Sequence, residues 1–174
     1  MLTTILVLLA LGGVITQSAQ DDLGGCLYTP DANGHAVVPD GVTSIGESAF
    51  YKCVSLISIT LPDGLTSIGQ NAFQDATSLA SVSFPEGLTF IGESAFERAT
   101  SLTSVSFPES YTSIDPSAFR NAISLASVSF PESLTSIGNM AFSNTPSLVS
   151  LSFPKGLTSI GESAFGCCGD DSSV

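Results

Sequence analysis

The sequence predicts an α/β solenoid of about six stacked coils, each with one short parallel strand and one short helical turn. Ala-Phe recurs at a constant step of 23 residues, and Pro and Ile keep the same step. Each repeat also holds a short polar-apolar alternation, which indicates a strand. A unit this short cannot bury its apolar side alone, so neighbouring units share one core. The recurring phenylalanines are Phe50, Phe73, Phe96, Phe119, Phe142 and Phe165.

The strand is the first element of each unit. Ser81-Val82-Ser83-Phe84 alternates polar and apolar side chains, as a half-buried strand does. Pro85 ends the strand because proline has no amide hydrogen to donate to a ladder. Stacked units therefore place parallel strands ~4.8 Å apart.

The second element is a helical turn. After the strand the chain passes Leu88 and Ile91, and we expect a short helical turn from Glu93. In one unit Asp115-Pro116 stands where the others have Gly followed by a different residue. Aspartate caps helices and proline is favoured as a first helical residue, so this departure favours a helical start.

Composition excludes several classes of function. The chain has 174 residues, 43% hydrophobic and 11% charged, which argues against intrinsic disorder. A net charge of −12 argues against binding nucleic acid through its phosphates. The single histidine, His35, lies in a polar stretch and is interpreted as a loop residue. No phosphate loop, nucleophile elbow or zinc motif is present, so we expect no enzymatic activity, no cofactor and no metal site.

The unit Leu-x-x-Val-x-Phe-Pro-x-x-Leu-x-x-Ile-Gly-x-x-Ala-Phe resembles the BspA-like, or Treponema-type, leucine-rich repeat over about residues 36–168. The family's cysteine three residues after Phe is kept at Cys53 and Cys168, and other residues replace it elsewhere. The resemblance implies a curved, right-handed leucine-rich-repeat solenoid. It also implies a secreted or cell-surface protein used for adhesion and protein binding, without enzymatic activity.

Four segments are expected along the chain. Residues 1–19 resemble a secretion signal, with an uncharged apolar stretch too short to span a bilayer and small residues near Ser18 and Ala19. An uncleaved anchor or a buried N-terminal segment is the alternative. Residues 20–38 form an N-terminal cap, residues 39–168 the solenoid, and residues 169–174 an acidic tail. After signal cleavage we expect no membrane insertion and a secreted or cell-surface location.

The cysteines predict one disulfide. Cys53 and Cys168 occupy the same repeat position in units five apart, so stacking separates them by ~24 Å, far more than a disulfide spans. Cys26 is therefore expected to pair with Cys53, which ties the cap to the first unit. For Cys167 and Cys168, free thiols and intermolecular pairing both stay open.

Two serine-rich columns are expected on the open face of the sheet. They offer a flat, hydroxyl-lined binding face, although serine could equally be a small soluble residue that duplication has kept. A regular lattice of hydroxyls also raises an ice-type surface-binding alternative, to which an unbroken threonine column from Thr43 to Thr158 adds. The candidate face residues are Ser58, Thr60, Ser81, Ser83, Ser104, Ser106, Ser127, Ser129, Ser150 and Ser152.

An acidic edge follows the prolines, and Lys155 breaks the series. It could attract a cationic partner or bridging Ca²⁺, or it could be a solvated stripe that discourages edge aggregation. The acidic residues are Asp40, Asp63, Glu86, Glu109 and Glu132.

The function predicted from these features is a non-enzymatic secreted or surface module that binds a protein or a glycan. One alternative is a structural or fragmentary repeat that self-associates through an uncapped C-terminal end. The other is the surface-lattice binder. Nucleic acid is not expected as a partner.

Overall fold

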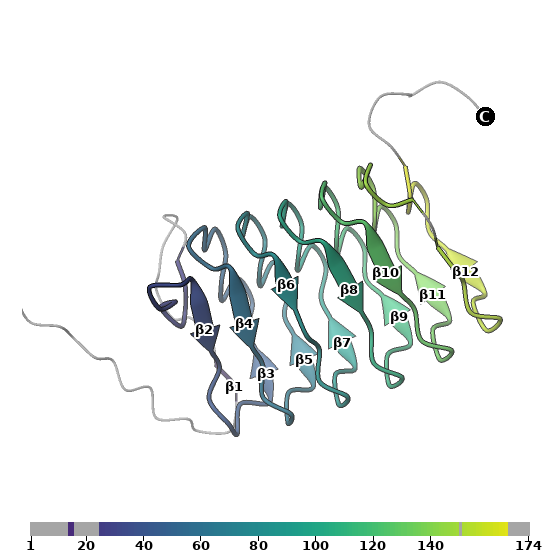
Figure 1. Cartoon of the computed structure of the whole chain (residues 1–174). Coiled ribbons are helices and arrows are strands. Elements are labelled where there is room, and N and C mark those ends of the chain that lie inside the picture. The colour runs from purple at the N-terminus through teal and green to yellow at the C-terminus, as the bar shows by residue number, and fades with distance from the viewer. Residues whose placement is uncertain (1–13, 16–24, 150, 167–174) are drawn as a thin grey trace, which may run out of the picture.

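The computed structural model describes residues 14–15, 25–149 and 151–166. These residues form a parallel-strand solenoid of about five turns, with a strand on each of two opposite sides of a coil (Figure 1). The sequence suggested about six coils because Ala-Phe occurs six times, but six copies enclose only five full steps. The expected stacked solenoid is confirmed, and each coil holds more strand than the sequence indicated.

The first sheet contains the strands that the polar-apolar alternation predicted. Their parallel register follows the repeat, so that Ser58 pairs with His35 on one side and with Ser81 on the other. Alternation also sets burial, because Val105 is 3% exposed while its neighbours Ser104 and Ser106 face solvent. The strands are β2 (His35–Val37), β4 (Ser58–Thr60), β6 (Ser81–Val82), β8 (Ser104–Ser106) and β10 (Ser127–Ser129).

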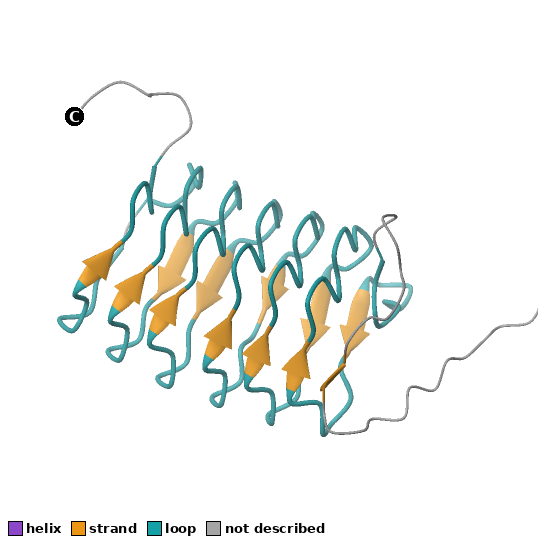
Figure 2. Ribbon diagram, turned by 180° about the vertical axis from the view of Figure 1, so that it is seen from behind, coloured by secondary structure: helices purple, strands orange, loops and turns teal. Residues whose placement is uncertain are grey.

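A second row of parallel strands was not predicted (Figure 2). Most of these strands consist of Ser-Ile, which is too short for an alternation to be recognised. The isoleucine points into the core, and Ile45 and Ile68 are fully buried and paired. The strands are β1 (Val14–Ile15), β3 (Ser44–Ile45), β5 (Ser67–Ile68), β7 (Phe90–Ile91), β9 (Ser113–Ile114), β11 (Ser136–Ile137) and β12 (Ser159–Ile160).

The expected helical turns are wrong, and so is the α/β class: the described part of the chain contains no helix. Turns occupy these segments instead, because their amides bond to the next coil. The amide of Phe73 donates to the carbonyl of Ala95 at 2.7 Å, whereas a helix would need an acceptor four residues back. Asn71 and Asp75 adopt left-handed backbone angles with φ of 56° and 59°, which a right-handed helix does not allow.

Stacked phenylalanines form the centre of the core, as predicted. Phe73 and Phe96 are fully buried, with ring centroids 4.9 Å apart and planes within 7°. The column continues from Phe96 to Phe119 at 5.2 Å. A second aromatic column, to which Phe84 and Phe107 belong, packs beside it. The shared core therefore extends through successive coils.

Both sheets are interrupted at one junction. β6 and β8 belong to different sheets, and so do β7 and β9. The repeat places glycine where coils touch: a Cβ on Gly92 would lie 2.7 Å from the amide nitrogen of Gln70. Asp115 occupies this glycine position at the interrupted junction and carries a Cβ. Its extra bulk gives a steric reason for the separation, and the capping role predicted for Asp115-Pro116 does not exist.

The N-terminal end of the solenoid is covalently fixed. Cys26 and Cys53 form the expected disulfide, with Cα atoms 5.0 Å apart. β1 pairs with β3, so two residues of the expected secretion signal form a strand. The remainder of segment 1–19, together with Cys167, Cys168 and the acidic tail, lies outside the described residues. In the described ranges, no helix is long and apolar enough to cross a membrane.

Candidate functional site: a hydroxyl face between two charged edges

The structure places the serine columns on the outer side of the first sheet. Ser81, Ser104 and Ser127 are exposed on three successive strands, and Ser83, Ser106 and Ser129 follow in the neighbouring column. Thr60 and Ser152 are also exposed, Ser58 is half-buried, and Ser150 lies outside the described residues. The backbone thus brings these hydroxyls onto one continuous surface.

The face begins one strand earlier than the sequence analysis proposed. His35 lies on β2, in register with Ser58, and is therefore part of this surface rather than a loop. Hydrogen bonds join its Nδ1 to the Ser58 hydroxyl (2.8 Å) and its Nε2 to the Thr60 hydroxyl (3.1 Å). Val37 extends the second column and is 58% exposed. The step of 23 residues, counted backwards from Ser58 and Thr60, would have found both residues.

Asp31 supports this end of the face through the backbone. Its Oδ1 accepts hydrogen bonds from the amides of Asn33 at 2.8 Å and His35 at 3.0 Å. These bonds favour the ionised carboxylate and hold the pKa of Asp31 below its usual value. The carboxylate binds the amide of His35, so the printed contacts of the imidazole are with hydroxyl groups.

The threonine column beside the second sheet uses its hydroxyl groups internally. Thr66 Oγ1 donates to the carbonyl of Thr43 at 3.0 Å, and Thr89 Oγ1 donates to the carbonyl of Thr66 at 3.2 Å. Thr135 and Thr158 make the same contact with the preceding coil. Each of these hydroxyls stabilises the stacking and has its hydrogen committed to the backbone.

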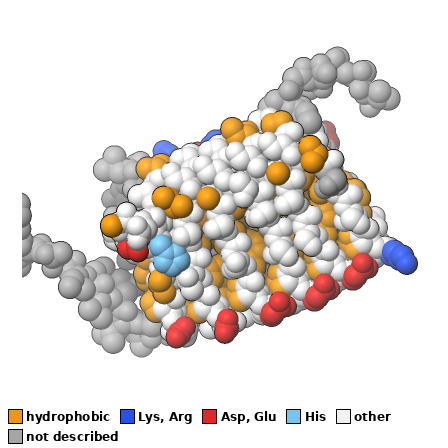
Figure 3. All heavy atoms as spheres, in the orientation of Figure 1, with side chains coloured by type: hydrophobic (Ala, Val, Ile, Leu, Met, Phe, Trp, Pro, Cys, Tyr) orange, Lys and Arg blue, Asp and Glu red, His pale blue; other side chains and the backbone are white. Residues whose placement is uncertain are grey.

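The predicted acidic edge is exposed and continuous. A row of acidic side chains follows one border of the serine face (Figure 3). The five carboxylates come from the turns after the prolines of successive coils, which stacking aligns. Within the described ranges, no group of three or more His, Cys, Asp or Glu side chains could hold a metal ion. The edge therefore offers negative charge without a preformed cation cage.

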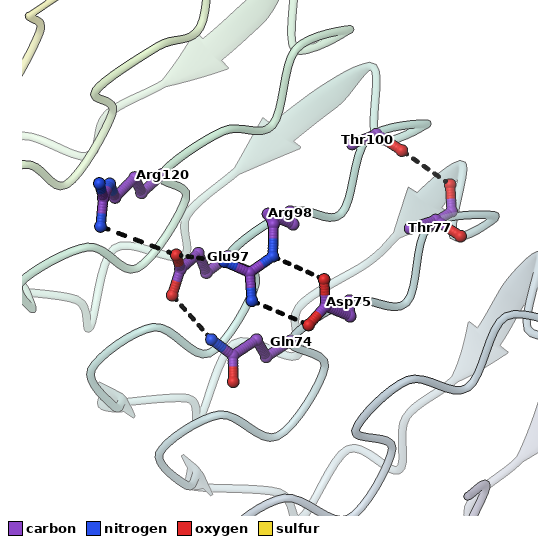
Figure 4. Close-up of polar contacts among 7 residues, drawn as sticks. All are labelled: Gln74, Asp75, Thr77, Glu97, Arg98, Thr100 and Arg120. Carbon is purple, nitrogen blue, oxygen red and sulfur yellow. Dashed lines mark hydrogen bonds and ion pairs between the residues drawn. The ribbon is translucent and has the colours of Figure 1, made fainter. Parts of the chain in front are cut away.

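The opposite edge carries a paired charge network that the sequence analysis missed (Figure 4). Arg98 donates to both carboxylate oxygens of Asp75 at 2.6 and 2.9 Å, and to Glu97 at 3.0 Å. Glu97, with a side chain 8% exposed, also accepts from Gln74 at 2.8 Å and lies 3.9 Å from Arg120. The Arg98 guanidinium holds the pKa of Asp75 below its usual value. The repeat step relating Asp75 to Arg98 was the available signal.

The fold and its repeated face define a leucine-rich-repeat binding module. The family model for the BspA type leucine rich repeat region matches six copies over residues 36–170. The chain therefore belongs to the BspA-type leucine-rich-repeat family, as its repeat motif indicated.

Solved structures support this assignment. A leucine-rich cell-surface protein of Faecalibacterium prausnitzii is 35% identical with a TM-score of 0.70, and the match covers 75% of this chain and 35% of that protein. The leucine-rich repeat protein of T. pallidum is 32% identical with a TM-score of 0.52, over 77% and 54%. A leucine-rich repeat protein of Eubacterium ventriosum is 25% identical with a TM-score of 0.58, over 78% and 43%. The chain thus spans only part of each relative's length, and no curated protein sequence matches it.

Proposed function

We propose that the chain is a non-enzymatic, secreted or cell-surface module that binds a protein through the outer face of its first sheet. A glycan is the alternative ligand class. The observation that carries the proposal is the unbroken outward column from His35 to Ser127, held in register by β2, β4, β6, β8 and β10. Such a surface is flat, rigid and rich in hydroxyl groups that both donate and accept hydrogen bonds.

Two further observations support an extracellular location. The Cys26–Cys53 disulfide persists in oxidising compartments, and residues 1–19 match the pattern of a secretion signal. The Faecalibacterium relative is described as a cell-surface protein. We therefore take residues 20–38 as the cap and residues 39–168 as the solenoid of the exported chain. The proposal includes neither nucleic acid nor a membrane insertion after signal cleavage.

Site-specific photo-crosslinking tests the binding face. A photoreactive amino acid replaces Ser83 on the first sheet or, as the matched control, Ser136 on the second sheet. Both positions carry a small serine in a repeated outward column, so neither change disturbs the core. Incubation with an extracellular matrix extract is expected to yield a discrete crosslinked protein from position 83 and none from position 136. Equal crosslinking from both positions would contradict the assignment of the face.

Self-association through the C-terminal end is a second candidate function. In the last described coil, Val149 is 84%, Phe153 44% and Ile160 51% exposed, which favours contact with another apolar surface. Residues 167–174, on which the original expectation rested, lie outside the described part of the chain. Light scattering over a concentration series, with Phe153→Ser as the comparison, tests this candidate: growth of the particles that the substitution abolishes would support it.

The surface-lattice alternative receives less support. A lattice binder needs hydroxyl groups that are available to the surface, whereas Thr66, Thr89, Thr135 and Thr158 donate theirs to the preceding coil. The serine columns of the first sheet are still exposed. A measurement of thermal hysteresis decides between the two: none is expected from a protein-binding module.

A further inference from the structure

Departures from the repeat gather at the junction between β7 and β9. Phe90 stands where neighbouring coils carry serine, Tyr111 stands where others carry leucine, and Asp115 stands where others carry glycine. All three flank the place where the second sheet is interrupted. This clustering makes the surface at the junction chemically unlike the rest of the sheet.

Phe90 is an exposed aromatic side chain on an otherwise hydroxyl-lined column. It is 47% exposed, whereas Ile91 beside it is fully buried and fills the core position of the strand. The core therefore does not require an aromatic residue at position 90. Exposed aromatic side chains surrounded by small polar residues act as anchors in protein interfaces. The other described members of its column are Ser44, Ser67, Ser113, Ser136 and Ser159.

Two carboxylates lie at the same junction. Glu93 follows Phe90 by three residues and is exposed. Asp115 lies two residues beyond Ser113, the counterpart of Phe90 in the next coil, which is about 7 Å along an extended chain. Burial and the charge of Glu93 raise the pKa of Asp115, so the two carboxylates repel each other. Neither forms an ion pair with a described residue, and a cation at this place would relieve the repulsion.

We propose that the β7–β9 junction binds an arginine side chain of a polypeptide partner, with the guanidinium over the Phe90 ring and its charge against Glu93 and Asp115. A planar guanidinium stacks on an aromatic face and pairs with carboxylates at the same time, which a lysine ammonium does less well. The site lies on the second sheet, away from the serine face, and its success or failure is independent of crosslinking at position 83.

Fluorescence anisotropy with two labelled peptides tests the proposal on the full chain. One peptide alternates arginine with alanine, and the other alternates lysine with alanine, so that both carry the same charge. The arginine peptide is expected to bind about fivefold more tightly, as an exposed cation–π contact supplies. The acidic edge by itself attracts both peptides equally. Equal binding of the two peptides, or no binding of either, would overturn the proposal.

Variants that restore residues of other coils locate the preference. Phe90→Ser is expected to abolish the arginine preference, and Phe90→Leu, which keeps an apolar residue in case serine affects folding, is expected to do the same. Glu93→Gln should reduce it. Retention of the preference in the Phe90→Leu protein would refute the anchor.

Two controls test whether the junction itself is required. Ser67→Phe adds an aromatic residue where Gln70 and Gly92 replace the carboxylates, and it should add no arginine preference. Glu109→Gln on the acidic edge should weaken both peptides alike and leave their ratio unchanged. A new preference from Ser67→Phe, or a ratio lost in Glu109→Gln, would overturn the assignment to this junction.

Discussion

The phenolic oxygen of Tyr111 accepts a hydrogen bond from the backbone amide of Ile91, with an N–O distance of 3.1 Å, inside the core. Because β7 and β9 are not paired, this amide has no acceptor on a neighbouring strand, and the side-chain hydroxyl takes that place. Burial, and secondarily the charge of Asp115, raise the pKa of Tyr111, so the hydroxyl stays neutral. One side chain thereby stabilises the interrupted junction.

Tyr111→Phe tests the role of this hydroxyl. The substitution leaves the buried Ile91 amide without a partner, which we expect to cost about 1–3 kcal/mol of the free energy of unfolding. Urea unfolding followed by circular dichroism measures the change. Tyr51→Phe is the control, since Tyr51 is half-buried on the turn surface, and its cost should stay within about 0.5 kcal/mol. Equal effects of the two substitutions would contradict the assigned role.

Gly92→Ala tests how closely the coils approach. Its Cβ would lie 2.7 Å from Gln70 N and 2.9 Å from Gly69 C, and neither backbone atom can move without separating the coils. We expect a loss of about 1–3 kcal/mol in chemical unfolding. Gly64→Ala is the matched control, because nothing lies within 4 Å of its Cβ. If Gly64→Ala were as damaging as Gly92→Ala, close packing could not be the reason.

Phe119→Ala tests the shared core. The ring is fully buried between Phe96 and Phe142, and its removal leaves a cavity that we expect to cost about 3–5 kcal/mol. Phe90→Ala removes the same atoms from an exposed position and should change stability by less than about 0.5 kcal/mol. Thermal melts of the two variants provide the comparison, and an unchanged melt of Phe119→Ala would refute the continuous core.

Arg98→Gln tests the charge network through its dependence on pH. Arg98 lowers the pKa of folded Asp75 below the unfolded value of about 3.9. The ion pair therefore stabilises the fold above the unfolded pKa, and this contribution disappears as the pH falls through the folded pKa. We expect Arg98→Gln to lower stability near neutral pH and to show a smaller further loss in acid than the wild type. Lys155→Gln, at an exposed position of the acidic edge, should leave the acid loss unchanged.

Removal of the Cys26–Cys53 disulfide tests the cap. The bond closes a loop with a sequence separation of 27, so its loss should cost about 3–4 kcal/mol through the entropy of the unfolded chain. The double substitution Cys26→Ser with Cys53→Ser, measured by urea unfolding, provides the value. A reducing agent should destabilise the wild type by a similar amount and leave the double variant unchanged. Sensitivity of the double variant to the reducing agent would indicate a different cause.

The repeat step allowed much of the architecture to be predicted. A constant interval fixes which residues stack, because every coil must return the chain to the same point of its neighbour. It therefore predicted the Phe73–Phe96 stacking, the first sheet and the Cys26–Cys53 bond. The same interval would have added His35 and Val37 to the face had it been extended to the first strand.

By itself, the sequence determined the period, the buried columns and the sign of the charge at each edge, since these depend on residue type and spacing alone. Only the tertiary structure decided that amides such as that of Phe73 bond to the next coil and thereby form turns rather than helices. It also decided that Asp115 separates two strands, because the clash is between atoms of different coils. Local propensity describes bonds within a segment, whereas in this solenoid many backbone amides find their acceptors 22 to 24 residues away.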